Sequence, residues 1–295
     1  MRPDADLRRL AFSVAYRMLG SVAEAEDVAQ ETLLRLHRTD DVANPEGFVT
    51  TAATRLAIDV LRSARARREV YSGPWLPEPV VTEGGAQDRL EDEETISLAF
   101  LVLLERLSPE ERAVYVLREA FDYDFAAIAE IVGKTATHCR QILSRARRRV
   151  DDERPRFDAD PEQRRTLAAR FLDAARRGDM EALVELLAPD VVITGDGGGK
   201  ARALPRPLVG AEAVARAMVA FYELGARWGA TLEPAVVNGQ PGFRSRDPEG
   251  RVINVVGIDV EGGRIVRIHS ILNPDKLGHL GPLSDLGLRP RVSPS

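Results

Sequence analysis

The side chains best suited to chemistry with nucleic acid lie near the middle of the chain, between Leu107 and Val150. The sequence predicts a helix that begins near Thr135 or Thr137, either of which can cap it, and runs to Val150. Its inward stripe consists of Cys139, Leu143, Ala146 and Val150. Its outward face carries His138, Arg140, Gln141, Ser144, Arg145 and Arg148. Because arginine and glutamine bind base edges and phosphates, this face is a candidate DNA-reading surface.

The segment before this helix strengthens that interpretation. Phe125, Ile128, Ala129 and Val132 fall on one helical face, and Gly133 tolerates the left-handed backbone of a tight turn. Two short helices joined in this way form a helix-turn-helix, which places its second helix in the DNA major groove. A basic amphipathic helix alone is more often a solvated face, so the prediction depends on the preceding helix and turn.

The composition narrows the classes of protein to which the chain can belong. The 295 residues suffice for two or three domains, and 44% hydrophobic and 29% charged residues are ordinary for a globular chain. No apolar run is long enough for a membrane span and the N-terminus lacks an apolar signal core, so we expect a cytoplasmic protein without membrane association. The single cysteine, Cys139, excludes an internal disulfide and a multi-cysteine zinc site, and we expect neither metal nor cofactor.

The net charge of −5 is unusual for a protein that binds DNA alone, because phosphate neutralisation supplies most non-specific affinity. The basic residues nevertheless cluster, in Arg62 to Arg68 and in Arg140 to Arg149, whereas Glu83 to Glu94 is acidic. Two basic patches on an acidic chain predict that another component helps to hold the DNA.

Three helices are expected before residue 70. The first spans Leu7 to Leu19, and Ser21 with Glu24 forms a capping box for the second. The second helix has a polar face of Glu26, Asp27, Gln30 and Glu31. This face is either solvated or a docking face for a basic protein, and spacing alone does not decide.

A polar loop from His37 to Ala43 leads into the third helix, which Asn44 caps and Pro45 begins. Arg55 and Arg62 lie off its buried stripe, which makes this helix a second candidate for binding nucleic acid.

The segment from Tyr71 to Leu90 is rich in proline and glycine and reads as a linker. It contains the rigid sequence Trp75, Leu76, Pro77, Glu78 and Pro79. An exposed tryptophan is costly, so we favour a docking segment packed on another domain over a passive tether.

The chain after Pro161 predicts an α+β domain, with helices first and then a run of antiparallel strands. Helices are expected over residues 166–177, 180–187 and 211–224, and strands over 191–193, 233–238, 242–245, 252–260 and 264–271. The residues after Leu277 read as a tail.

These segments together resemble an extracytoplasmic-function (group 4) sigma factor of the sigma-70 family. The run from Ala25 to Glu31 resembles the family's core-binding helix, and Asn44 to Arg62 the helix that helps to melt and read the minus-ten element. The sequence Leu107 to Arg112 and the ending Ser144 to Arg147 resemble the region that reads the minus-thirty-five element. The ordered set is more specific than any one motif.

The resemblance implies roles for individual residues. Asp27, Gln30 and Glu31 would bind the clamp helices of the largest subunit of core RNA polymerase, whose flap region is a second expected contact. The loop from His37 to Ala43 would capture a flipped base, with Arg55 and Arg62 on the strand backbone. The minus-thirty-five residues divide into base readers, Arg140 and Gln141, and phosphate contacts, Arg145 and Arg148.

The C-terminal part resembles a SnoaL-like domain of the nuclear-transport-factor-two superfamily, a curved sheet and helices around a cone-shaped pocket. Sigma factors with this fused extension share three motifs, which stand here as Trp75 to Pro79, Asp196 to Lys200 and Asn273 to Leu277. The resemblance implies that the extension adjusts sigma activity in cis. Some superfamily relatives are isomerases or cyclases, for which Asp196 and His269 are the available bases, although the glycine run after Asp196 reads as too flexible to hold one.

The expected organisation is therefore a multidomain chain of two all-α domains followed by one α+β curved-sheet domain. Residues 1–70 form sigma region 2, 71–93 the linker, 94–152 sigma region 4, 153–163 a second linker, 164–280 the SnoaL-like domain and 281–295 a tail.

We expect the extension to dock on the linker and to fix the separation of the two DNA-reading regions. The residues expected to make this contact are Trp75, Leu76, Pro77, Glu78, Pro79, Asp196, Lys200, Asn273, Asp275 and Lys276. Glu78 is expected to pair with Lys200 or Lys276, and Asp196 or Asp275 with a backbone amide. The C-terminal pocket is also a candidate site for an unknown small ligand.

Three other readings stay open at this point: a ligand-responsive repressor, an isomerase or cyclase with a helical appendage, and an adaptor that binds polymerase without reading a promoter. The sequence does not distinguish an extension that inhibits from one that polymerase binding requires.

Overall fold

The computed structural model describes residues 4–68, 71–82, 96–150 and 160–288. The side chains of Arg65, Arg67 and Arg68 and the acidic run from Glu83 to Glu94 lie outside these residues, as do residues 151–159 of the expected second linker. The chain divides into two compact units. Met1–Val70 and Phe100–Arg154 form the first, and Tyr71–Ala99 and Pro155–Ser295 form the second.

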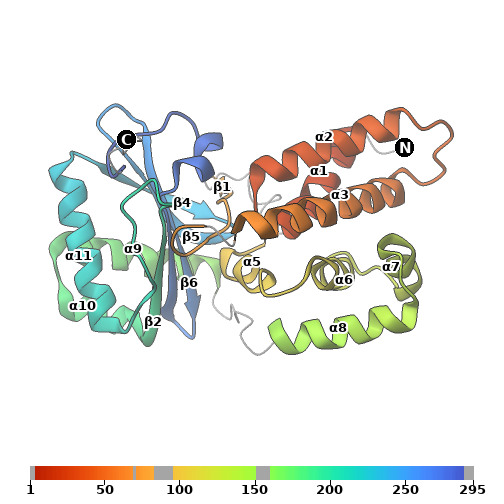
Figure 1. The fold of residues 1–295 in the computed structure, drawn as a ribbon. Coiled ribbons are helices and arrows are strands. Elements are labelled where there is room, and N and C mark those ends of the chain that lie inside the picture. The colour runs from red at the N-terminus through yellow and green to blue at the C-terminus, as the bar shows by residue number, and fades with distance from the viewer. Residues whose placement is uncertain (1–3, 69–70, 83–95, 151–159, 289–295) are drawn as a thin grey trace. The chain divides into compact units, whose positions relative to one another are not determined.

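The first unit is helical (Figure 1). Its helices are α1 (Asp4–Leu19), α2 (Val22–His37), α3 (Pro45–Arg68), α5 (Leu98–Leu104), α6 (Pro109–Glu119), α7 (Phe125–Val132) and α8 (Ala136–Val150), with the start of α5 assigned to the second unit. Side-chain caps begin several of them: Ser21 accepts from the Glu24 amide, Asn44 from Gly47 and Asp124 from Ala127. Each such cap contributes about 1 kcal/mol.

The helix-turn-helix expected from the sequence is present as α7 and α8. Gly133 ends α7 with a φ of 66°, in the left-handed region that a side chain disfavours. Thr135 caps α8 by accepting from the His138 amide at 3.2 Å. The expected inward stripe is buried, which leaves the basic residues on the opposite face.

Within this unit, a buried arginine joins α6 to α1. Arg112 is 2% exposed and donates to the carbonyl of Met18 at 2.6 Å, the carbonyl of Leu104 at 2.9 Å and the carboxylate of Glu105 at 2.6 Å. Burial lowers the pKa of Arg112 to about 9, so the guanidinium still carries its charge at neutral pH.

The second unit has three main helices against one face of a sheet (Figure 1). The helices are α9 (Pro161–Arg177), α10 (Met180–Leu186) and α11 (Ala211–Arg227). The strands are β1 (Val81–Thr82), β2 (Leu187–Asp196), β3 (Leu208–Val209), β4 (Thr231–Val237), β5 (Gln240–Arg246), β6 (Val252–Glu261) and β7 (Arg264–Ile271), in the order β1-β4-β5-β6-β7-β2-β3. The expected α+β fold is confirmed.

Three local expectations were wrong. β2 pairs with β7 in parallel, whereas the sequence suggested only antiparallel strands. α9 begins at Pro161, inside the segment expected as a linker up to residue 163. The expected tail packs on the domain as far as Leu288: Pro282 and Gly287 accept from the amides of Val252 and Arg202 at 2.9 and 2.8 Å. Residues 289–295 lie outside the described residues.

Among the described residues, no helix is long and apolar enough to cross a membrane. The same residues contain no group of three or more histidine, cysteine or acidic side chains arranged to hold a metal ion.

We predict that Arg112→Ala lowers the free energy of unfolding of the helical unit by about 3 kcal/mol, because it leaves the Glu105 carboxylate and two carbonyls without their donor. Denaturant titration followed by far-ultraviolet circular dichroism measures this change. The matched control, Arg145→Ala, removes an exposed arginine of α8 and should change the value by less than about 0.5 kcal/mol. Equal effects of the two variants would contradict the bridging role of Arg112.

Candidate functional site

The most densely bonded polar group of the second unit is the carboxylate of Asp196, at the end of β2. Asp196 is 0% exposed. It accepts hydrogen bonds from the Tyr71 hydroxyl at 2.5 Å, the Leu76 amide at 2.8 Å and the Gly198 amide at 3.0 Å. Burial, and then the bond to Asp196, raise the pKa of Tyr71, so its phenol stays protonated and remains the donor. Two residues of the linker are thus bound to one side chain of the C-terminal domain.

Lys276 completes this site from the short helix η2 (Pro274–Lys276). Its ammonium group is buried, donates to Asp196 at 2.7 Å and also donates to the carbonyl of Leu76. The Lys276 nitrogen lies 4.2 Å from the ring centroid of Trp75 and 4.9 Å from that of Tyr71. Both rings therefore contribute cation–π attraction to a charge that has left water. We name Tyr71, Trp75, Leu76, Asp196 and Lys276 the linker-docking site.

The glycine run after Asp196 packs closely against its surroundings. Gly198 has a φ of 57°, and a side chain there would collide with Asn273, whose amide nitrogen lies 2.3 Å from the position of an added Cβ. Asn273 in turn donates to the Tyr71 hydroxyl at 2.8 Å and accepts from the Asp275 amide at 3.1 Å. The second and third shared motifs therefore meet the linker at one place.

The remaining motif residues lie nearby with weaker constraints. Lys200 pairs with Asp275 at 2.6 Å, but both side chains are more than half exposed, so this pair adds little stability. Leu76, Pro77, Glu78 and Pro79 are buried. The expected pairing of Glu78 with a lysine stays a prediction.

The linker is also tied to the far edge of the sheet. Val81 and Thr82 form β1, which pairs antiparallel with β4. The Asn238 side chain accepts from the Val80 amide at 2.9 Å and donates to the Ile96 carbonyl at 2.9 Å. His279 contacts the Pro79 carbonyl at 2.8 Å. Sequence reasoning missed Tyr71, Asn238 and His279, because their partners lie far away along the chain.

A cavity of about 380 Å³ lies between the sheet and helices α9 and α11. Gly195, Ile268 and Ser270 line it, whereas their neighbours Asp196 and His269 point the opposite way, as alternation along a strand requires. His269 instead contacts Asp259 at 2.8 Å, and both are buried. Asp196 and His269, the two candidate bases, are therefore not positioned to act on a molecule in the cavity.

The α8 face carries four exposed residues singled out from the sequence: Arg140, Gln141, Arg145 and Arg148. The Arg140 guanidinium lies 5.0 Å from the centroid of the Phe125 ring, which steadies it at the start of the helix. Arg147 and Arg149 differ, because they pair with Glu119 and Glu111 of α6 at 2.7 Å each. The helix therefore carries two sets of arginines. Arg147 and Arg149 form ion pairs with α6, whereas Arg140, Arg145 and Arg148 face solvent.

The two α3 arginines expected to contact DNA have protein partners within the first unit. Arg55 donates to the carbonyls of Glu130 and Ile131 near the end of α7, at 2.9 and 3.0 Å. Arg62 pairs with Glu110 of α6 at 2.6 Å. Binding of either arginine to DNA would require exchange of these partners.

On α2, Asp27 and Gln30 are exposed and Glu31 is half-buried, paired with Arg35 at 2.8 Å. Leu34 is an exposed leucine that continues the same stripe, since residues 27, 30, 31 and 34 share one helical face. Sequence reasoning missed Leu34, although its spacing was visible.

Comparison with known proteins identifies each part of the chain. Residues 5–67 match sigma-70 region 2, residues 97–150 match sigma-70 region 4, and residues 168–268 match the SnoaL-like domain. The chain is 38% identical over 290 residues to the ECF RNA polymerase sigma factor SigJ of Mycobacterium tuberculosis, covering 92% of this chain and 90% of that protein. It is 32% identical over 281 residues to the probable ECF RNA polymerase sigma factor SigI of the same species, covering 92% and 93%.

The fold agrees with these matches. The crystal structure of SigJ from Mycobacterium tuberculosis aligns with a TM-score of 0.76 at 35% identity, over 95% of this chain and 98% of that one. Sigma factors bind core RNA polymerase and promoter DNA and are not enzymes. With both sigma regions in order and a SnoaL-like domain after them, the chain belongs to the extracytoplasmic-function sigma factors of RNA polymerase.

Proposed function

We propose that the C-terminal domain controls this sigma factor in cis by holding the linker between the two sigma regions. The observation that carries the proposal is the buried Lys276–Asp196 pair, whose two side chains bind the carbonyl and the amide of Leu76. A promoter sets one distance between its minus-ten and minus-thirty-five elements. The described part of the linker, bonded at Tyr71, Leu76 and Val80, has little freedom to move away from the C-terminal domain.

We further propose that the docked linker accompanies an inhibited state. The contacts of Arg55 with α7 and of Arg62 with α6 occupy two side chains assigned here to the minus-ten strand. Release of the linker would let the sigma regions separate and free both arginines for phosphates. The activity belongs in the cytoplasm, where core polymerase and promoter DNA are found.

The α2 stripe of Asp27, Gln30, Glu31 and Leu34 is proposed to bind the clamp helices of the largest polymerase subunit, with the flap region as a contact of region 4. Its acidic and amide groups lie beside one exposed apolar side chain, an arrangement suited to a basic helical partner. On α8, we assign base reading to Arg140 and Gln141 and phosphate contact to Arg145 and Arg148.

Lys276→Met should raise transcription by core polymerase about fivefold or more, because it breaks the docking site while keeping an apolar stem over Trp75. Reconstituted transcription with the full chain measures the change. The matched control is Lys200→Met, which removes only the exposed pair with Asp275 and should leave transcription unchanged. Unchanged output from Lys276→Met would contradict control by docking, and lost output would show that docking serves polymerase binding.

Asp27→Arg should weaken binding to core polymerase about tenfold, since it reverses a charge at the centre of the proposed contact. Titration of labelled protein with core polymerase gives the dissociation constant. Asp190→Arg makes the same charge change at an exposed position of β2 and serves as the control. Equal affinities of the two variants would place the polymerase contact elsewhere.

Arg140→Ala should relax sequence preference at one minus-thirty-five base pair, at a cost of about 1–3 kcal/mol for the preferred base. Arg148→Ala should instead weaken binding uniformly and lower the salt slope of holoenzyme binding by about 1. Salt titrations on a set of single-base promoter variants separate the two effects. If both variants gave the same profile, the division into base readers and phosphate contacts would be wrong.

A further inference from the structure

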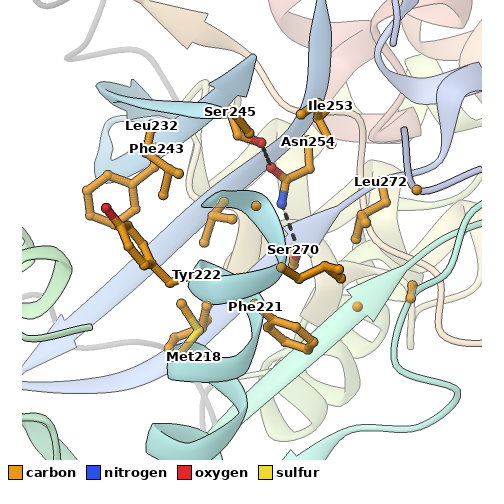
Figure 2. Close-up of a pocket in the computed structure, with 18 of the residues that line it drawn as sticks. Met218, Phe221, Tyr222, Leu232, Phe243, Ser245, Ile253, Asn254, Ser270 and Leu272 are labelled. Atoms are coloured by element: carbon orange, nitrogen blue, oxygen red, sulfur yellow. Dashed lines mark hydrogen bonds between the residues drawn. The ribbon is translucent and has the colours of Figure 1, made fainter. Parts of the chain in front are cut away.

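The cavity of the C-terminal domain is built for a ligand that is mostly apolar. Its volume, about 380 Å³, falls within the range of small-molecule sites. Figure 2 shows Met218, Phe221 and Tyr222 of α11 facing Leu232 and Phe243 of the sheet across it. Phe221 and Leu224 also have exposed side chains, so the apolar lining continues to solvent, as an entrance requires.

One polar row crosses this apolar surface. The Ser245 hydroxyl donates to the Asn254 carbonyl oxygen, and the Asn254 amide donates to the Ser270 hydroxyl at 3.4 Å (Figure 2). All three residues line the cavity. A primary amide has two N–H donors and an oxygen with two lone pairs, so these two bonds leave Asn254 capacity for one polar group of a ligand.

The charge of the lining limits the ligand further. Arg202 is the one charged residue among the described residues that line the cavity, and its side chain is exposed. Among the described lining residues a cation would find no acidic partner, and an anion away from Arg202 would lose its water without gaining an ionic partner, which is strongly unfavourable.

We propose that this cavity binds an uncharged, ring-bearing apolar molecule whose single hydrogen-bonding group contacts Asn254, and that its occupancy is coupled to linker docking. The coupling follows from the strands that the two sites share and rests on the proposed function. Gly195 and Leu272 line the cavity, whereas the next residues, Asp196 and Asn273, bind the linker residue Tyr71. The Leu272 and Asn273 amides both donate to the Asp196 carbonyl, at 2.8 and 2.9 Å, so a shift of one strand moves both sites.

The ligand part is tested with N-phenyl-1-naphthylamine, a neutral fluorophore with two aromatic groups, phenyl and naphthyl, and one N–H donor. The full chain should bind it saturably, with one site per chain. Its sulfonated analogue, 8-anilino-1-naphthalenesulfonate, should bind about tenfold or more weakly, because its charge cannot be buried. Absence of saturable binding, or tighter binding of the sulfonate, would overturn the proposed ligand class.

Two tryptophan variants locate the binding. Leu232→Trp fills the cavity from β4 at a partly exposed position and should reduce binding of the neutral probe about tenfold. Val209→Trp adds the same side chain on β3, at an exposed residue outside the cavity, and should leave binding unchanged. Equal binding by both variants, with circular dichroism showing both folded, would place the probe elsewhere.

The coupling is tested by measuring the neutral probe on Lys276→Met, in which the docking site is broken but the cavity lining is intact. Linkage requires that two coupled sites change each other's affinity by one factor, so the dissociation constant should differ from wild type about fivefold or more. Equal constants would overturn the coupling and leave the ligand site standing. Transcription by the same variant tests control in cis independently, so failure of one proposal is distinguishable from failure of the other.

Discussion

The buried pair of Lys276 and Asp196 is the interaction on which the rest of the second unit depends. Two charges taken out of water cost several kcal/mol each, and their mutual attraction offsets this only when the remaining donors and acceptors are also satisfied. Here Tyr71, Leu76 and Gly198 supply those partners, and the first two belong to the linker. A C-terminal domain without the linker would leave a buried carboxylate short of two donors. The linker is therefore a structural part of this domain, as the division into units also indicates.

The same strand carries two different surfaces because side chains alternate along it. At the end of β2, Gly195 faces the cavity and Asp196 faces the linker. The buried carboxylate of Asp196 therefore serves a structural contact with the linker. The polar row inside the cavity consists of the neutral residues Ser245, Asn254 and Ser270. This arrangement argues against an isomerase or cyclase, for which Asp196 or His269 would have supplied the base, and it supports our proposal that the cavity binds a ligand without transforming it. The chain belongs to the sigma factors, which excludes a ligand-responsive repressor. It contains both sigma regions, which argues against an adaptor that binds polymerase without reading a promoter.

Local patterns were predictable from the sequence, and long-range pairings were not. The stripe of Cys139, Leu143, Ala146 and Val150 follows helical periodicity alone, and it is buried as expected. By contrast, the hydroxyl of Tyr71 binds a carboxylate 125 residues away, and no spacing rule connects them. The close packing of Gly198 also depends on a distant side chain, Asn273, which the glycine run alone does not reveal. Residues 281–288 show no helical or strand periodicity and read as a tail, although backbone hydrogen bonds hold them to the domain.

If docking controls the sigma factor, the linker is docked in the free protein and released when the sigma factor works. Amide hydrogen exchange at Leu76 tests this directly, because that amide donates to a buried carboxylate only while the linker is docked. The measurement compares the full-length protein alone with the same protein in an initiating complex with core polymerase and promoter DNA. We predict slow exchange at Leu76 in the free protein and fast exchange in the complex. Equally slow exchange in a complex that initiates transcription would contradict control by docking.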